Sequence, residues 1–339
     1  MTTSTLTSWA LSIWNTLKEE GFDPLPVFKQ AGADPGKLGD GQARYELHTM
    51  YQLWELAVKT TRNDDFGVNV GANWGPTTFH ALGFAWLASN SLLDGLKRVT
   101  RYARLVNNSL IAHLDPAGAN YRLTINTTTR IELRHPAGID GGAAAIIAMC
   151  RKLVGNDFKP VELLLTREYR APGRLEAFAG CEMQYNQSEN AVLFDAVQAE
   201  KELYTGNAAL AQTNEHVAAE YLKRIARDDV VGSVRSTLTK LLPTGEINEE
   251  IVSQSLNMNL RTLQRKLKDE GTSFRDILNT TREEIALDYI RNSNLSLTEI
   301  GYLLGFADQA NFTRAFRRWT EMSPSAYRKN LQSKKVANL

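Results

Sequence analysis

One short pattern occurs twice in the last hundred residues, and it limits what this part of the chain can fold into. The run Leu263-Gln264-Arg265-Lys266-Leu267 is followed 49 residues later by Phe312-Thr313-Arg314-Ala315-Phe316. Both runs have the order apolar, polar, Arg, variable, apolar. Each also follows a residue that caps helix N-termini well, Asn259 in the first case and Asp308 in the second. The repeat predicts two amphipathic helices, over 259–270 and 308–320.

Each predicted helix has a buried stripe and an opposite face that is rich in Arg. Leu260, Leu263 and Leu267 lie at i, i+3 and i+7 in the first helix, and aromatic residues occupy the matching stripe of the second. On the opposite faces, Arg suits guanine, Gln suits adenine, and Thr can contact a base or the thymine methyl group. The expected base contacts are Arg261, Gln264, Arg265, Gln309, Thr313 and Arg314.

Further helical segments precede and join these two helices. A short helix is expected over 249–258 ahead of the first and over 297–306 ahead of the second, which is the arrangement of a helix-turn-helix unit. A long helical stretch over 274–291 lies between the units. At about 1.5 Å per residue it spans roughly 27 Å, which is close to the ~34 Å of one duplex turn. The pattern therefore predicts an all-α domain whose two helix-turn-helix units, joined by a long helix, bind one face of double-stranded DNA.

Length and composition set the remaining limits. The chain of 339 residues is long enough for two domains. Residues 231–339 hold 16 Lys and Arg against 12 Asp and Glu, whereas residues 1–230 hold 23 against 26. This modest basic excess agrees with a polyanionic partner. No apolar run approaches the ~18–20 residues of a membrane span, the first residues lack the pattern of a secretory signal, and the two cysteines indicate neither a disulfide framework nor a metal site. We expect a cytoplasmic protein without a metal or cofactor.

The first 205 residues have a different pattern. Helical spacing prevails up to about residue 104, and strands then alternate with helices, which predicts an α+β domain. The expected elements after residue 104 are strands over 110–113 and 121–125 joined by an Asp-Pro-Ala-Gly turn, a helix over 141–153, a strand over 161–166, a helix over 174–178 and a strand over 191–194. The expected domains are an effector-sensing and dimerisation domain over 1–205, a helical connector over 206–230, a DNA-binding domain over 231–332 and a tail over 333–339.

The C-terminal segments resemble the AraC/XylS family of bacterial regulators. The resemblance covers roughly residues 231–331, and its strongest runs are Arg261 to Arg265, Gly271 to Phe274, Ile300 to Phe306, Asn311 to Trp319 and Ser323 to Arg328. Some positions depart from the family pattern: Ser253 and Gly301 replace Ala, Asn257 replaces a turn Gly, Asn259 replaces a Ser cap, and Glu321 replaces a Gly. Because Asn tolerates left-handed backbone geometry, its place in the turn is compatible with the fold.

The resemblance implies a sequence-specific transcription regulator of the activator type, with RNA polymerase as a second partner. It assigns base contacts to the two Arg-rich faces. It assigns phosphate contacts, which position the protein without reading sequence, to Lys268, Arg317, Arg318 and Arg328. The N-terminal half is similar to the arabinose-binding-type domain of a subset of these regulators, through residues 65–67, 79–87 and 91–102. This similarity implies a small-molecule effector, which need not be arabinose, and a homodimer.

Candidate effector residues are aromatic side chains with a nearby cation. We expect a pocket, with Arg101 or Arg104 holding a carboxylate, that is lined by Trp74, Phe79, Phe84, Trp86, Arg101 and Tyr102. The alternative is that these aromatic residues belong to an ordinary core. Two other functions also stay open: an N-terminal module that binds a protein or dimerises constitutively, and a fused DNA-repair or metabolic enzyme. No catalytic residue is proposed, because the sequence has no Gly-x-Ser-x-Gly or His-Glu-x-x-His motif.

Overall fold

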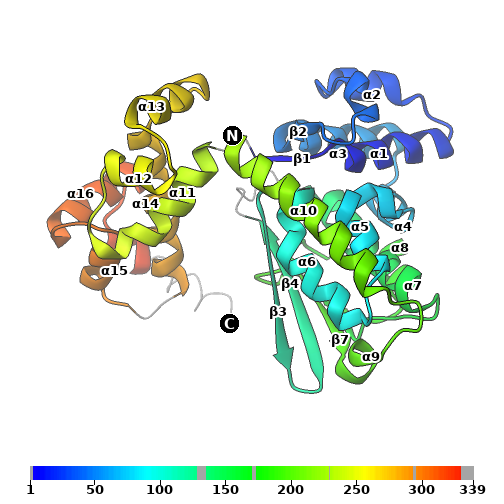
Figure 1. Ribbon diagram of the computed structural model, residues 1–339. Helices are drawn as coiled ribbons and strands as arrows, with labels where there is room; N and C mark the ends of the chain where they lie inside the picture. The colour runs from blue at the N-terminus through cyan, green and yellow to red at the C-terminus, as the bar shows by residue number, and fades with distance from the viewer. Residues whose placement is uncertain (1–2, 128–134, 170–172, 229, 293–294, 330–339) are drawn as a thin grey trace. The chain divides into compact units, whose positions relative to one another are not determined.

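The computed structural model describes residues 3–127, 135–169, 173–228, 230–292 and 295–329 (Figure 1). The chain separates after residue 223 into an N-terminal unit, which contains both helices and sheets, and a C-terminal helical unit. The two-domain fold class predicted from the sequence is therefore confirmed. The division falls inside helix α10, Ala208–Asp228, within the segment that the sequence identifies as a connector.

The helices of the N-terminal unit begin near the start of the chain. A two-stranded antiparallel sheet pairs β1, Ser4–Leu6, with β2, Arg44–Glu46. The helices before the larger sheet are α1 (Thr7–Glu19), α2 (Pro24–Gln30), α3 (Leu47–Thr61), α4 (Phe66–Ala72), α5 (His80–Leu87) and α6 (Leu92–Val106), with 3-10 turns η1 (Pro35–Gly39) and η2 (Pro76–Phe79). The Ser91 side chain accepts the backbone N–H of Asp94 at 3.0 Å and caps α6.

A five-stranded sheet follows, with the strand order β3-β4-β7-β5-β6. Its neighbouring strands are antiparallel except for β5 and β6. The strands are β3 (Leu110–Ala117), β4 (Asn120–Thr127), β5 (Glu162–Leu164), β6 (Glu182–Gln184) and β7 (Ala191–Asp195), and the helices among and after them are α7 (Pro136–Val154), α8 (Arg174–Ala179) and α9 (Ala196–Glu200).

The structure corrects three local expectations in this unit. The Asp-Pro-Ala run at 115–117 lies inside β3 rather than in the turn, and the register places the turn at Gly118 and Ala119. β3 is an edge strand, where Pro removes no ladder hydrogen bond that the sheet needs. Helix α7 begins at Pro136 rather than at residue 141. The short strands β1, β2 and β6 were not predicted, since three residues are too few to show an alternating pattern.

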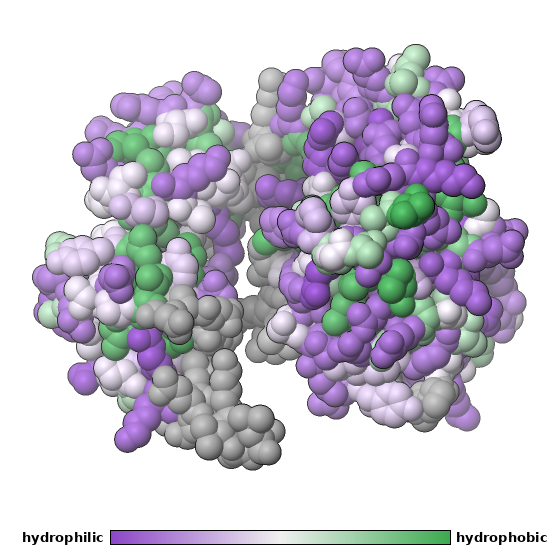
Figure 2. All heavy atoms as spheres, turned by 90° about the horizontal axis from the view of Figure 1, so that it is seen from below, coloured by the Kyte–Doolittle hydropathy of each residue, from purple (hydrophilic) through white to green (hydrophobic). Residues whose placement is uncertain are grey.

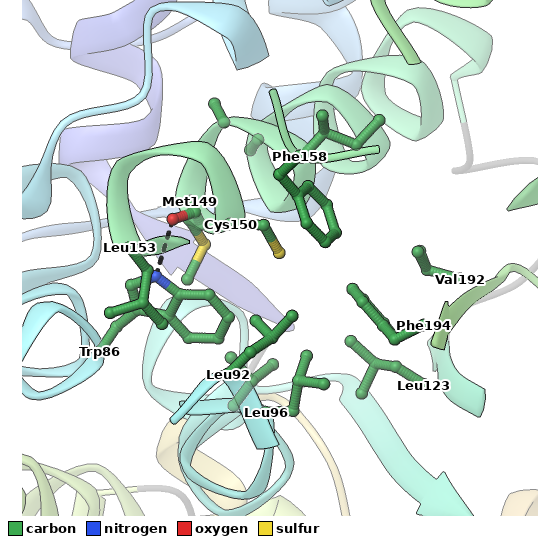
Figure 3. Packing of buried hydrophobic residues seen from close by; sticks show 14 of the residues in the cluster. Trp86, Leu92, Leu96, Leu123, Met149, Cys150, Leu153, Phe158, Val192 and Phe194 are labelled. Carbon is green, nitrogen blue, oxygen red and sulfur yellow. Dashed lines mark hydrogen bonds between the residues drawn. The ribbon is translucent and has the colours of Figure 1, made fainter. Parts of the chain in front are cut away.

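The largest core of the N-terminal unit lies between α6, α7 and the sheet. In Figure 3, Leu123, Val192 and Phe194 from the sheet lie opposite side chains of α6 and α7. Trp86 is fully buried here, and its indole N–H donates to the carbonyl of Met149 at 2.9 Å. A buried indole with a satisfied N–H is a fixed part of the packing.

Helices α4 and α7 approach each other closely through glycines. A Cβ atom added at Gly67 would lie 1.9 Å from the carbonyl oxygen of Ala137, and one added at Gly71 would lie 2.2 Å from that of Gly141. By contrast, a Cβ at Gly142, on another side of α7, would meet no atom within 4 Å. The absence of side chains at residues 67 and 71 therefore allows the two backbones to touch.

Helices are the only regular secondary structure among the described residues of the C-terminal unit. Its elements are α11 (Val230–Leu241), η4 (Leu242–Thr244), α12 (Glu249–Ser255), α13 (Leu260–Asp269), α14 (Phe274–Asn292), α15 (Leu297–Leu303) and α16 (Gln309–Thr320). The caps predicted from the sequence are present: Asn259 accepts the N–H of Thr262 at 2.8 Å, and Asp308 accepts that of Asn311 at 2.6 Å. Among the described residues of the whole chain, no helix is long and apolar enough to cross a membrane. The surface seen in Figure 2 is mostly hydrophilic, with hydrophobic side chains in small groups.

Two small cores hold the helix-turn-helix units. Leu263 and Leu267 of α13 pack with α11, α12 and the start of α14, whereas Phe312 and Phe316 of α16 pack with α15 and the end of α14. Arg235 of α11 forms an ion pair with Glu284 of α14 at 2.8 Å. Because α14 contributes to both cores, it joins the two units as one continuous element.

We expect Gly301→Ala to stabilise the C-terminal unit by about 0.5–1 kcal/mol, because Gly inside a helix is entropically unfavourable. An added Cβ would lie 3.4 Å from the Cβ of Phe312, which is ordinary contact. Chemical denaturation followed by circular dichroism measures the change. The matched control is Gly305→Ala, at a left-handed φ of 69° and with an added Cβ only 2.9 Å from the carbonyl of Leu242. A loss of stability in both variants would contradict this packing.

Candidate nucleic-acid interface and ligand cavity

Helix α13 presents the first Arg-rich face. Arg261, Gln264, Arg265 and Lys268 are all exposed, while Leu263 and Leu267 are fully buried on the other side. The structure thus brings together the four predicted DNA contacts of this unit. The Gln264 side-chain amide donates to the carboxylate of Glu249 at 3.1 Å. This contact fixes the amide against α12 and was not expected from the sequence.

Helix α16 presents the second face. Gln309, Arg314, Arg317 and Arg318 are exposed, and Thr313 is half-buried beside them. The hydroxyl of Thr298 on α15 donates to the Gln309 side-chain oxygen at 3.0 Å. The Arg314 guanidinium donates to the Asn311 side chain at 2.6 Å. In both units, therefore, a side chain of the preceding helix holds an amide of the recognition helix in place.

Two of the predicted phosphate contacts also hold the domain together. The Arg328 guanidinium is half-buried and donates to the carbonyl of Leu295 at 2.9 Å. Arg318 reaches the Asn279 side chain of α14 at 3.3 Å. Arg317 and Lys268 are exposed. Of the four residues, Arg317 and Lys268 are therefore the better placed to meet a phosphate.

Arg282 is a structural residue that sequence reasoning did not identify. It lies on α14 and donates to the carbonyls of Leu304 and Gly305, both at 2.9 Å, and its guanidinium lies 4.4 Å from the ring centre of Phe306. Burial lowers the pKa of Arg282 from its ordinary value. The residue ties the turn of the second helix-turn-helix unit to the joining helix. In the sequence Arg282 stands next to two glutamates, 283 and 284, and such a charged run gives no sign that the Arg side chain is partly buried.

The turns and the start of α15 agree with the substitutions noted in the sequence. Asn257, in the turn of the first unit, has a φ of 53°, and Glu321, after α16, has a φ of 61°. Both lie in the left-handed region that Asn tolerates and Gly prefers. Ser296 and Glu299 form a capping box at α15, and hydrogen bonds from Ser296 lower the pKa of Glu299. The departures from the family pattern therefore leave the backbone course intact.

The comparisons with known proteins agree with this geometry. Residues 21–203 match the family model described as the arabinose-binding domain of AraC transcription regulator, N-term, and residues 252–330 match a helix-turn-helix domain model. The first match covers more than half of the chain. The chain belongs to the AraC family of transcription regulators. The resemblance inferred from the sequence is confirmed, and with it a DNA-binding domain of the AraC type.

Individual proteins are similar to this regulator over most of its length or over about a quarter of it. The HTH-type transcriptional regulator VqsM of Pseudomonas aeruginosa is 26% identical over 77% of this chain and 83% of its own length. The urease operon transcriptional activator of Escherichia coli is 40% identical over 24% of this chain and 27% of its own. The crystal structure of the transcriptional regulator CdpR from Pseudomonas aeruginosa covers 93% of this chain and 97% of its own, at 21% identity and a TM-score of 0.45.

The six residues expected to line an effector pocket lie together only in part: Trp74 packs against Phe79, with ring centres 5.9 Å apart, in the core cluster that also contains Trp86. Trp74 and Trp86 are fully buried in the core, and Tyr102 packs in a cluster with α10. Phe84 is 44% exposed, and the exposed Arg101 lies 3.7 Å from Glu215. Arg104 donates to the carbonyl of Asn108 at 3.2 Å. The buried members of the set, Trp74, Trp86 and Tyr102, are part of the core packing.

A cavity does exist in this AraC-family regulator, and Phe79 is the member of that set that lines it. The cavity has a volume of about 280 Å³ and lies between the helices and strands β4, β5 and β7. Its walls include Trp9 of α1, Trp54 of α3, Val99 of α6 and Ile146 of α7. The sequence could not reveal it, since its lining comes from segments spread over nearly 190 residues.

Proposed function

We propose that this regulator reads the major groove with both recognition helices, α13 and α16. The observation that carries the proposal is the pair of capped amphipathic helices whose exposed faces each combine Arg with an amide or a hydroxyl. Arg261, Gln264 and Arg265 would contact bases through α13, and Gln309, Thr313 and Arg314 through α16. Bidentate contacts of this kind discriminate by ~1–3 kcal/mol per base.

Two exposed cations, Lys268 of α13 and Arg317 of α16, are proposed to contact phosphates. We expect Arg317→Ala to weaken binding about equally on all DNA sequences and to reduce the slope of log affinity against log salt by about 0.9, because one fewer counterion is released. Fluorescence anisotropy on cognate and scrambled duplexes at four salt concentrations measures both quantities. The matched control, Lys29→Ala, removes an exposed cation of α2 in the N-terminal unit and should leave the slope unchanged. A change of sequence preference in Arg317→Ala would reassign this residue to base reading.

The N-terminal unit is proposed to sense a small molecule and to pass the signal along α10. Glu215 of this helix pairs with Arg98 of α6 at 3.1 Å, and Arg98 also pairs with Asp94. Ala218 is fully buried in a cluster with α5 and α6, and the Tyr221 hydroxyl donates to the carbonyl of Gln42 at 3.1 Å. The same two helices supply Leu82 and Val99 to the cavity wall. A bound molecule that moves α5 or α6 would therefore directly change the contacts that hold α10 against the N-terminal unit.

We further propose a homodimer that activates transcription through RNA polymerase. Linking two DNA-binding units raises affinity through effective concentration. On α10, Leu210 and Val217 are one heptad apart and both more than half exposed, which supplies apolar surface for a second copy. The similarity to a relative named as a transcriptional activator supports activation rather than repression. Light scattering tests the dimer, and a monomer at a concentration that saturates the operator would contradict it. In vitro transcription from a promoter with the operator tests activation, and a fall in transcript on adding the protein would contradict it.

A further inference from the structure

The cavity in the N-terminal unit is too large to be a packing fault. Protein interiors are packed like organic crystals and contain few voids larger than a water molecule. An engineered apolar hole of ~150 Å³ is already large enough to take up benzene, whereas this cavity measures about 280 Å³. Its walls are made mainly by apolar side chains, among them Trp9, Trp54, Phe79, Ile125, Ile146 and Met149. Such a lining favours an apolar occupant.

The described residues that line the cavity include no Lys, Arg, Asp or Glu. The imidazole of His135 accepts the backbone N–H of Ala137 through Nδ1 at 3.2 Å. A carboxylate or an ammonium group placed here would lose its hydration without gaining an opposite charge from the described lining, which costs several kcal/mol. A sugar would lose the hydration of a hydroxyl on nearly every carbon. Free amino acids, ionised fatty acids and sugars therefore fit this lining poorly.

Two sets of hydrogen-bonded polar side chains contribute residues to the cavity wall. The Asn107 Oδ1 accepts the Ser109 hydroxyl at 2.8 Å, and that hydroxyl lies 2.7 Å from the hydroxyl of Thr127. Next along β4, the Asn126 Oδ1 accepts the backbone N–H of Asn190 at 3.4 Å. The Asn190 Oδ1 accepts the N–H and the hydroxyl of Thr166.

These bonds use the side-chain oxygens of Asn126 and Asn190. Within the described part of the chain, neither side-chain NH₂ group has a partner, and both residues are half-buried at the cavity wall. Amide N–H groups in that situation suit an acceptor oxygen on the occupant.

We propose that the cavity is the effector site and that its effector is an uncharged, mainly apolar molecule with a ketone, ester or amide oxygen held by Asn126 and Asn190. This inference rests on the proposed sensing role of the N-terminal unit. The proposed ligand differs in chemistry from arabinose, the sugar after which the N-terminal family model is named.

The test uses the full chain and three probes: 2-nonanone, octanoate and arabinose. Trp9 and Trp54 line the cavity, so an occupant changes tryptophan fluorescence directly. We expect 2-nonanone to produce a saturable change with a Kd on the order of 0.1–1 mM or tighter, as a probe of this size allows. Octanoate, which has a chain of similar length but a charge, and arabinose should bind at least tenfold more weakly.

Two variants locate the site. Gly142 lines the cavity and has open space around a would-be Cβ, so Gly142→Phe should fill the cavity and abolish the response, while Gly142→Ala should retain it. Asn126→Leu should weaken the binding of 2-nonanone about three- to tenfold, because it removes one hydrogen-bond donor. It provides a second readout if the Phe variant does not fold.

The outcomes separate this inference from the proposed function. Saturable 2-nonanone binding that Gly142→Phe or Asn126→Leu reduces supports the site. A wild-type protein that binds operator DNA but shows no response to 2-nonanone, or that binds octanoate or arabinose as tightly, overturns the inference and leaves the DNA-binding function standing. A 2-nonanone response at this site that leaves operator affinity and transcription unchanged overturns the assignment of the cavity as an effector site.

Discussion

Arg265→Ala is expected to reduce operator affinity about 5- to 150-fold and to remove sequence preference at one part of the operator only. A bidentate Arg contact with guanine is worth ~1–3 kcal/mol, and Arg265 is exposed at the centre of the α13 face with no ion-pair partner in the described residues. Loss of such a contact removes both the favourable energy and the discrimination at that base. Affinity for non-specific DNA should fall much less, because that affinity depends on phosphate contacts.

The control for Arg265→Ala lies next to it in the sequence. Lys266→Ala removes the same charge from the half-buried flank of α13, so any general electrostatic effect should be shared by both variants. Footprinting and anisotropy on a series of single-base operator variants distinguish them. If both variants lost the same affinity with unchanged base preference, the effect would be one of charge alone, and α13 would not be reading bases through Arg265.

Gly71→Ala is expected to destabilise the N-terminal unit by about 3 kcal/mol or more. The added Cβ would lie 2.2 Å from the carbonyl oxygen of Gly141 and 2.8 Å from the Cβ of Ala144. The first group is backbone and the second is a stiff side chain, so the helices α4 and α7 must separate. Overpacking of this kind typically costs about 1–3 kcal/mol or somewhat more. Five of the six tryptophans lie in this unit, so tryptophan fluorescence during urea unfolding reports its stability.

Gly142→Ala supplies the matched comparison on the same helix. Its added Cβ would meet no atom within 4 Å. The variant should therefore gain about 0.5–1 kcal/mol from reduced backbone entropy. An equal effect of the two substitutions would mean that α4 and α7 do not touch through Gly71.

The sequence predicted the DNA-binding domain well because each local signal agreed with the next. Asn259 and Asp308 are good caps, the apolar stripes of α13 and α16 have helical spacing, and both signals specify the same boundaries. Helices of this length carry enough residues to show which face is buried. The exposed Arg faces therefore follow from the same pattern.

The N-terminal unit was harder to predict because its local signals conflict with its tertiary packing. Pro116 was interpreted as a turn residue but lies in edge strand β3, where its missing N–H is harmless. The helix expected over 141–153 begins at Pro136, and Gly138 and Gly141 lie where α7 approaches Trp54 and α4. The cavity depends on which side chains fail to fill a space between distant segments. That property has no pattern along the chain. Of the six residues expected to line an effector pocket, Phe79 lines this cavity.

Both helix-turn-helix units are proposed to read bases. Selection of bound sequences from a random DNA pool by the full chain tests this most directly. We predict two conserved blocks separated by about one helical turn, roughly 10 base pairs from centre to centre, with Arg265→Ala erasing one block and Arg314→Ala erasing the other. A single block that both substitutions affect, or a block that neither affects, would contradict bipartite reading by α13 and α16.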